Sequence, residues 1–250
     1  MELAAAVPAE AFGLGVELVF ADARGSCRVP LGECLDRLFE DAVPARSFRW
    51  SRRQGHFPGW WWLATTGRHV GYESWLERDH LMLLDFDPAV TAVASQPFWL
   101  HWHDGRRSRR HAPDFFARLA DGTGVVIDVR ADDRIEPRDA EAFEATALAC
   151  EAAGWEFRRV GTVDPVLGAN VRWLSRYRHA RCAGRPGTAD ALRRAFASPA
   201  PLLAGAAGAG DSLAVLPVLF HLLWRRELTA DLGSGPLGPS TAVRVAAGAR

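Results

Sequence analysis

Hydrophobic and polar positions in the middle of the chain follow the patterns of alternating helices and strands. A helical period runs over 72–84 and again over 136–153, where Ala and Leu share one face. Short alternating or continuously apolar runs predict strands, and these are 90–94, 96–103, 111–119, 124–130 and 155–160. Asp121-Gly122 is a hairpin signal between two of these runs. The order of helix, strands, helix and strand predicts an α/β fold with a mixed sheet flanked by helices.

The two ends of the chain add smaller elements to this centre. A strand over 16–20 and a helix over 31–39 are expected near the N-terminus, followed by an aromatic and basic segment that contains Trp60-Trp61-Trp62. That cluster is a core or domain seam in one interpretation and a base-stacking surface in the other. The C-terminal pattern predicts, in order, helices over 166–178 and 188–196, a linker over 197–210, a helix over 213–226, and a hairpin from 228–232 and 241–245.

These patterns predict three parts of the chain. Residues 1–65 are expected to be an extension packed on a central α/β domain at 66–185, and Pro186-Gly187 marks the next boundary. Residues 186–250 are expected to form a winged-helix-like module, or alternatively a helical extension packed on the first domain. The most apolar stretch, about 12 residues from 213 to 224, is too short to cross a bilayer. With no secretory pattern at Met1-Glu2-Leu3, we expect a cytoplasmic protein without membrane contact.

Charge changes the expectations about partners. All 30 basic residues are arginine and the net charge is zero, so no overall positive field draws the protein onto nucleic acid. Contact with DNA would therefore depend on local clusters or on a partner. The candidate phosphate-binding residues are Arg106, Arg107, Arg109 and Arg110. The alternative for this run is an ordinary solvated surface.

A pair of acids on the central hairpin gives the first candidate chemistry. Asp114 starts one predicted strand, and Asp128 ends the next one after the turn. Arg130 lies two residues further, hence on the same strand face as Asp128. Paired carboxylates that fix Mg²⁺ beside a phosphate, with a cation nearby, are what metal-dependent phosphodiester hydrolysis requires. In the alternative interpretation, Asp114 is a turn residue and Asp128 pairs with Arg130 or Arg134.

Glu77 is the third candidate acid. Ser74-Trp75-Leu76-Glu77 also has the spacing of a helix capping box, and Glu73 is a competing acid. Three histidines could instead bind a metal or lie exposed on strands, namely His101, His103 and His111.

An ordered set of short motifs resembles the TnsA family of heteromeric transposase endonuclease subunits. The motifs are Thr66-Gly67-Arg68, Ser74-x-x-Glu77, Leu84-Asp85-Phe86-Asp87-Pro88-x-Val90, Gln96-Pro97-Phe98, Pro113-Asp114-Phe115 and Asp128-Val129-Arg130. This resemblance implies a restriction-endonuclease-like fold for 66–185 and an active site of Glu77, Asp114, Asp128 and Arg130. It also implies Mg²⁺, with Mn²⁺ as a possible substitute, for nicking DNA at transposon ends. The implied partners are a separate DDE-type transposase and an AAA+ ATPase, which the winged-helix-like domain contacts.

One position departs from that family. Arg130 stands where the family has its catalytic lysine, and a guanidinium keeps the charge but cannot give up a proton near neutral pH. Arg130 therefore serves if the cation only stabilises phosphate charge. Two alternatives remain open, a catalytically impaired scaffold or DNA-binding protein and a stand-alone repair or defence nuclease with the same fold.

Overall fold

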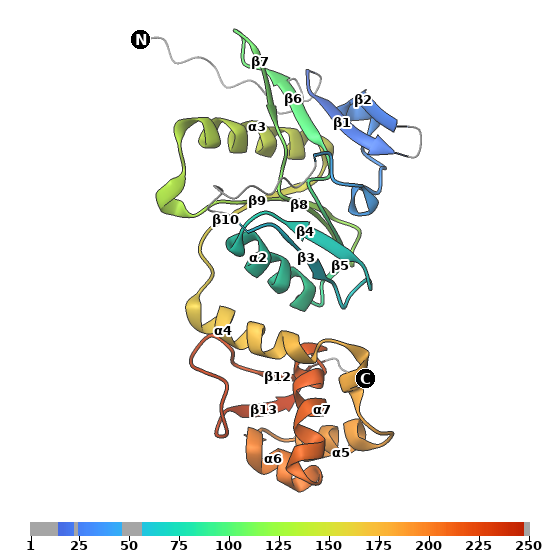
Figure 1. Cartoon of the computed structure of the whole chain (residues 1–250), viewed down its shortest axis with the longest axis vertical. Helices are drawn as coiled ribbons and strands as arrows, with labels where there is room; N and C mark the ends of the chain where they lie inside the picture. Colours follow the sequence, from blue (N-terminus) through green and yellow to red (C-terminus); the bar gives the residue numbers. More distant parts are fainter. Residues whose placement is uncertain (1–14, 23–24, 47–56, 248–250) are drawn as a thin grey trace. The chain divides into compact units, whose positions relative to one another are not determined.

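The computed structural model describes residues 15–22, 25–46 and 57–247, and these residues form two compact units (Figure 1). The first unit comprises residues 1–84 and 89–162, and the second comprises residues 85–88 and 163–250. This division differs from the expected boundary at Pro186, because the segment from 163 onward packs with the second unit.

A four-stranded mixed sheet lies at the centre of the first unit. Its order is β10-β9-β8-β5, with β9 and β10 parallel and the other pairs antiparallel. The strands are β5 (Val90–Ser95), β8 (Phe115–Leu119), β9 (Gly124–Val129) and β10 (Glu156–Val160). These bounds confirm the predicted strands 90–94, 124–130 and 155–160, and they confirm the α/β class.

The two long helices of this unit cover opposite faces of the sheet (Figure 1). Helix α2 (Trp75–Phe86) brings Leu81 into a core cluster with Phe115, and helix α3 (Pro137–Ala153) brings Ala149 into a second cluster with Phe116. Because Phe115 and Phe116 are adjacent on β8, their side chains point to opposite faces. The sheet thus separates two apolar layers, as a helix-flanked sheet requires.

The N-terminal segment belongs to this unit through a second sheet. Its strands are β2 (Gly25–Pro30), β1 (Glu17–Asp22), β6 (Trp99–His103) and β7 (Ser108–His111), in that spatial order. Leu18 of β1 and Leu100 of β6 are buried in the same cluster as Phe116. A separate hairpin of β3 (Gly59–Trp62) and β4 (His69–Tyr72) packs Trp61 on the α2 side, whereas Trp60 is exposed.

Three local predictions for this unit were wrong. The expected helix over 31–39 is two short 3₁₀ turns, Leu31–Glu33 and Phe39–Asp41, although the spacing of the buried residues Leu31, Cys34 and Phe39 also fits one face of a helix. The expected strand 111–119 is split between β7 and β8 by Pro113, which has no N–H for a ladder. Residue 72 ends β4, so α2 begins three residues later than expected.

The second unit combines helices with a small sheet. Its elements are α4 (Pro165–Leu174), η4 (Ser175–Tyr177), η5 (Ala180–Ala183), α5 (Thr188–Ala195), β11 (Ala200–Pro201), α6 (Leu202–Ala209), α7 (Ser212–Trp224), β12 (Leu228–Ala230) and β13 (Ala242–Val245). The three strands pair antiparallel in the order β11-β13-β12, which confirms the predicted hairpin. Within the described residues, no single helix is long and apolar enough to cross a membrane. Only α6 and α7 taken together reach that limit, with a 118° bend between them.

The predicted linker over 197–210 was also wrong, since it contains β11 and α6. Its glycine and alanine residues permit close packing. A Cβ atom at Gly205 would lie 2.3 Å from ring atoms of Phe196, so the small residue lets α6 approach that ring. The small residues of this segment therefore allow close helix packing, and they do not indicate a loop.

Candidate active site

The antiparallel pairing of β8 and β9 brings two predicted acids to one end of the central sheet. Asp114 directly precedes β8, and Asp128 lies one residue before the end of β9. Side chains alternate between the two faces of a strand, so Asp114 shares a face with Phe116, and Asp128 shares a face with Val126. Phe116 and Val126 both belong to the core on the α3 side of the sheet. The Val129 amide donates a 2.7 Å hydrogen bond to Asp114 Oδ2, which fixes one carboxylate against the neighbouring strand.

Helix α2 carries the third acid, Glu77, in its first turn. The Glu77 amide donates to Ser74 Oγ at 3.1 Å, and that hydroxyl donates to Glu77 Oε1 at 2.8 Å. Glu77 Oε2 accepts a 2.7 Å hydrogen bond from the Glu73 amide. The predicted N-cap role of Ser74 is therefore confirmed, whereas the Glu77 side chain accepts from the Glu73 amide, one residue before the cap, and not from the Ser74 amide as in a capping box.

These three acids line a single cavity of about 650 Å³. Arg130 and Arg110, also named from the sequence, line it too. The placement of these residues is a property of the structure, whereas their catalytic roles remain predictions. Arg106, Arg107 and Arg109 are not among the residues that line the cavity.

Carboxylates crowded into this cavity perturb one another. Burial raises the pKa of Asp114 well above its usual range, and the neighbouring charges of Glu77 and Asp128 raise it further, against the opposing effects of the Val129 amide and Arg46. Burial likewise raises the pKa of Glu77, although its hydrogen bonds from Glu73 and Ser74 and the charge of Arg46 oppose the shift. The cavity therefore concentrates negative charge in a partly dry environment.

Asp128 has a partner that the sequence did not predict. Its side chain is 2% exposed, and His111 Nε2 lies 2.8 Å from Oδ1 and 2.9 Å from Oδ2. His111 closes β7 and lines the cavity, whereas the other two histidines of the predicted trio do not line it. The expected alternatives, pairing with Arg130 or Arg134, are not the contacts that the structure shows for Asp128.

Arg130 follows β9 and lies half-exposed in the cavity wall. Its Nη2 is 3.3 Å from Asp139 Oδ1, in the first turn of α3. This contact differs from the pairing of Arg130 with Asp128 that the sequence left open as an alternative.

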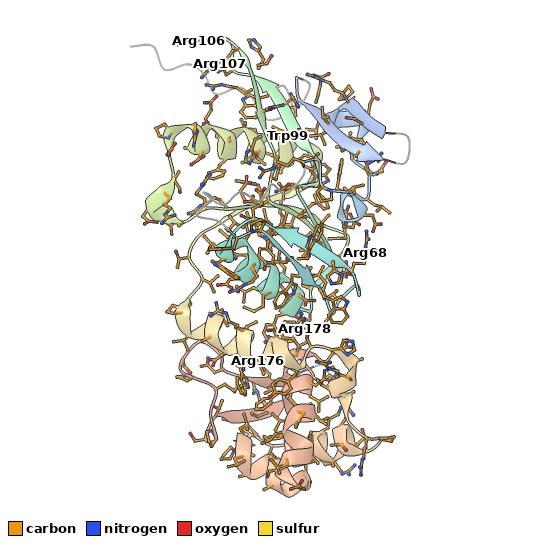
Figure 2. All side chains as sticks on the ribbon, in the orientation of Figure 1. Arg68, Trp99, Arg106, Arg107, Arg176 and Arg178 are labelled. Carbon is orange, nitrogen blue, oxygen red and sulfur yellow. The ribbon has the colours of Figure 1, made fainter. Side chains whose placement is uncertain are left out.

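The arginine cluster of β6 and β7 divides into three environments (Figure 2). Arg106 and Arg107 lie exposed at the turn of the hairpin. Arg109 is held by Asp104 at 2.6 Å and by Glu141 at 2.9 Å. Arg110 lies over the Trp99 ring, with 4.6 Å from its guanidinium carbon to the ring centroid. Only part of the cluster is thus open to a ligand.

Donor chemistry at this site suits a hard divalent cation. Three carboxylates supply the oxygen ligands that Mg²⁺ prefers, and a bound cation would relieve the repulsion that raises the pKa of Asp114. No three His, Cys, Asp or Glu side chains in the described residues are already arranged as a metal cluster. His111 Nε2 lies within hydrogen-bond distance of both oxygens of Asp128, and each of these oxygens retains a further lone pair for a cation.

Part of the chain that contains this site matches the model of a known protein family. Residues 87–161 match the family model described as TnsA-like endonuclease N terminal. The match spans β5 to β10 with Asp114, Asp128 and Arg130, while Glu77 lies outside it. It confirms the resemblance drawn from the sequence motifs, and it supports a nuclease. No curated protein matches the chain.

Proposed function

We propose that this TnsA-like nuclease is a Mg²⁺-dependent DNA endonuclease subunit that nicks at transposon ends. In this proposal it acts in the cytoplasm beside a separate DDE-type transposase and an AAA+ ATPase. One observation carries the proposal: Asp114, Asp128 and Glu77 line one cavity, in and next to the segment that matches the family. Because three carboxylates line the cavity, binding of a cation there is favoured.

Each site residue has a role in this reaction. Asp114 and Asp128 would hold Mg²⁺, or Mn²⁺ as a substitute, and Glu77 would complete the ligand set or orient the attacking water. The bound ion supplies charge stabilisation and a hydroxide nucleophile near neutral pH. Arg130 would contact a DNA phosphate from the cavity wall, because its one side-chain ion pair with a described residue, Asp139, leaves other N–H donors available.

The exposed arginines give the substrate a path to the cavity. Arg106 and Arg107 at the hairpin turn would meet backbone phosphates, and Arg110 in the cavity wall would meet them closer to the acids. Phosphate contacts of this kind position DNA without reading its sequence. Site selection would then depend on the partner proteins.

The second unit fits a partner-binding role better than a DNA-reading one. Its order of α5, β11, α6, α7, β12 and β13 supports the winged-helix-like module that we propose for residues 186–250. In that arrangement α7 would be the helix available for a DNA groove, yet its sequence from Ser212 to Trp224 contains no arginine, and Val218, Leu219 and Leu222 are buried. We therefore assign the contact with the AAA+ ATPase to this module.

A plasmid-nicking assay tests the function. Supercoiled DNA that carries the transposon ends is incubated with the chain, the transposase and the ATPase, in Mg²⁺ or in EDTA. With both partners present, we expect wild type to nick the DNA in Mg²⁺ but not in EDTA. We expect Asp114→Asn not to nick it in either condition. Equal nicking by wild type and Asp114→Asn would remove the acidic cavity from the reaction, and nicking without partners would favour a stand-alone repair or defence nuclease.

A second candidate function follows from two features of the site. Arg130 replaces the family's lysine, and His111 holds both oxygens of Asp128. A scaffold that has lost cleavage would retain the fold and bind DNA or partners without Mg²⁺-dependent nicking. Retained DNA binding together with the absence of nicking by wild type and by Arg130→Lys would select this alternative.

A further inference from the structure

The acidic cavity contains a cation that comes from outside the segment matched by the family. Arg46 lies between the second 3₁₀ turn and β3, and it lines the cavity together with the three acids. Its Nη2 donates a 2.5 Å hydrogen bond to Glu73 Oε2. Its Nε is buried and makes no hydrogen bond with any described residue. A buried guanidinium nitrogen without a partner is costly, and it marks a position where a ligand oxygen would be favoured.

Arg46 acts electrostatically on two of the acids, Asp114 and Glu77. Burial and neighbouring carboxylates raise the pKa of Asp114, and among the described side chains Arg46 is the cation that opposes this increase. The same charge opposes the increase at Glu77. Arg130 lines the same cavity, and its Nη2 lies 3.3 Å from Asp139 Oδ1 on α3.

A chain of backbone hydrogen bonds holds Arg46 in register with the acids. The Ala45 amide donates to Gln96 O at 2.8 Å, and the Gln96 amide donates to Asp114 O at 2.8 Å. Trp99 Nε1 also donates to Ala45 O at 3.3 Å. Gln96 adopts a φ of 46°, which is uncommon for a residue other than glycine. Backbone strain of this kind persists where the surrounding structure fixes a geometry, here the position of residue 46 relative to residue 114.

We propose that Arg46 is a catalytic residue of this nuclease, whose guanidinium contacts the scissile phosphate. It would supply from the N-terminal segment the positive charge that a lysine at position 130 supplies in the family. Nε–H and an adjacent terminal N–H form a planar edge that matches two phosphate oxygens. The terminal nitrogen on this edge is Nη2, whose second N–H would remain with Glu73, so that Glu73 is a positioning residue. This assignment rests on the proposed nuclease function and leaves Arg130 to a more peripheral phosphate.

Single-turnover nicking of end-containing DNA, in Mg²⁺ with both partner proteins, tests this role. Loss of one preorganised donor to a developing charge commonly slows a reaction by about 100-fold, which is the decrease expected for Arg46→Gln. Arg46→Lys should recover part of that rate. Arg68→Gln is the matched control, because Arg68 also pairs with one carboxylate, that of Asp41, but does not line the cavity. Its rate should stay within about twofold of wild type.

A double variant separates a catalytic role from simple neutralisation of Glu73. If Arg46 only balances the Glu73 charge, Arg46→Gln combined with Glu73→Gln should return to the rate of Glu73→Gln alone. If Arg46 contacts phosphate, the double variant should remain as slow as Arg46→Gln. Recovery of the rate, or equal rates for Arg46→Gln and Arg68→Gln, overturns the proposal.

Binding measured without cleavage keeps this test independent of the proposed function. A short end-containing duplex is titrated by fluorescence anisotropy, with Ca²⁺ in place of Mg²⁺. Failure of wild type to nick overturns the nuclease function, and binding then decides whether Arg46 contacts DNA phosphate. A Kd raised about fivefold or more by Arg46→Gln, but not by Arg68→Gln, supports that contact, and equal Kd values overturn it.

Discussion

At the scale of single residues, the three acids are held in different ways. Glu77 has both oxygens satisfied at the start of α2, and Asp128 has both oxygens against His111. Asp114 receives one backbone hydrogen bond, from Val129, and its pKa is raised well above the usual range by burial and by two neighbouring carboxylates. Asp114 is therefore the acid whose ionised form the fold supports least.

Asp114→Asn should consequently stabilise the protein in the absence of metal. The amide oxygen can still accept the Val129 N–H, while the charge and its repulsion with Glu77 and Asp128 disappear. We expect the free energy of unfolding to rise by about 1–2 kcal/mol, as for removal of a poorly compensated buried charge. Urea denaturation at pH 7.5 in EDTA measures this quantity, with the exposed Asp36→Asn as control. A decrease for Asp114→Asn would show that its charge is well compensated.

At the scale of elements, strands with continuous apolar patterns could be predicted from the sequence. The positions of residues that depend on contacts between distant segments could not. Strands β5 and β9 were predictable because each is a largely buried run between clear breaks, whereas no residue of β10 is buried. Asp114 and Asp128 could be paired from the sequence because one hairpin brings them together. Arg46 and His111 could not, since the contacts that place them join distant segments, such as Ala45 with Gln96. The short turns between β2 and β3 also escaped prediction, because the spacing of their buried residues is the same as that of a helix face.

Helix α2 allows the capping and chemical roles of Glu77 to be separated. Glu77→Gln keeps an oxygen acceptor for the cap and removes the charge, whereas Glu77→Ala removes both. We expect Ala to lower the free energy of unfolding by about 1 kcal/mol, the usual value of a helix cap, and Gln to lower it less. Both variants should lose nicking. Thermal denaturation followed by circular dichroism, run beside the nicking assay, compares them, and equal losses of stability would contradict the capping role.

His80, also on α2, makes the stability of the folded protein depend on pH. Burial lowers the pKa of His80 from its ordinary value of 6.5, although the Gly161 carbonyl, 2.6 Å from Nε2, opposes the shift. The folded protein therefore binds this proton less tightly than the unfolded chain. Stability is full above pH 6.5 and falls as the pH drops through the lowered pKa.

His80→Gln should remove this dependence of stability on pH. The variant should lose less unfolding free energy than wild type between pH 7.5 and pH 5, as measured by urea denaturation. His69→Gln, at an exposed position on β4, serves as the control and should follow wild type. Parallel curves for wild type and His80→Gln would exclude His80 as the source of the acid sensitivity.

At the scale of the whole molecule, zero net charge means that DNA affinity depends on a few local arginines. Binding by the isolated chain should be weak, and it should fall as salt rises. Each phosphate contact contributes about 0.9 to the slope of log K against log salt. Replacing Arg106 and Arg107 together by Gln should thus lower that slope by about 2, whereas Arg28→Gln, on β2, should leave it unchanged. An unchanged slope in the double variant would exclude the hairpin turn from the interface.

The capping contacts of Glu77 have a consequence for how this site would decay over evolutionary time. A lineage released from selection for cleavage still needs the start of α2, so loss of Glu77 remains harmful to the fold. Asp114 is under the opposite pressure, because a neutral residue there relieves a burden on stability. Inactive descendants should therefore retain the glutamate and lose Asp114 first. The identity of residue 114, rather than of residue 77, is then the better criterion for sorting active relatives from inactive ones.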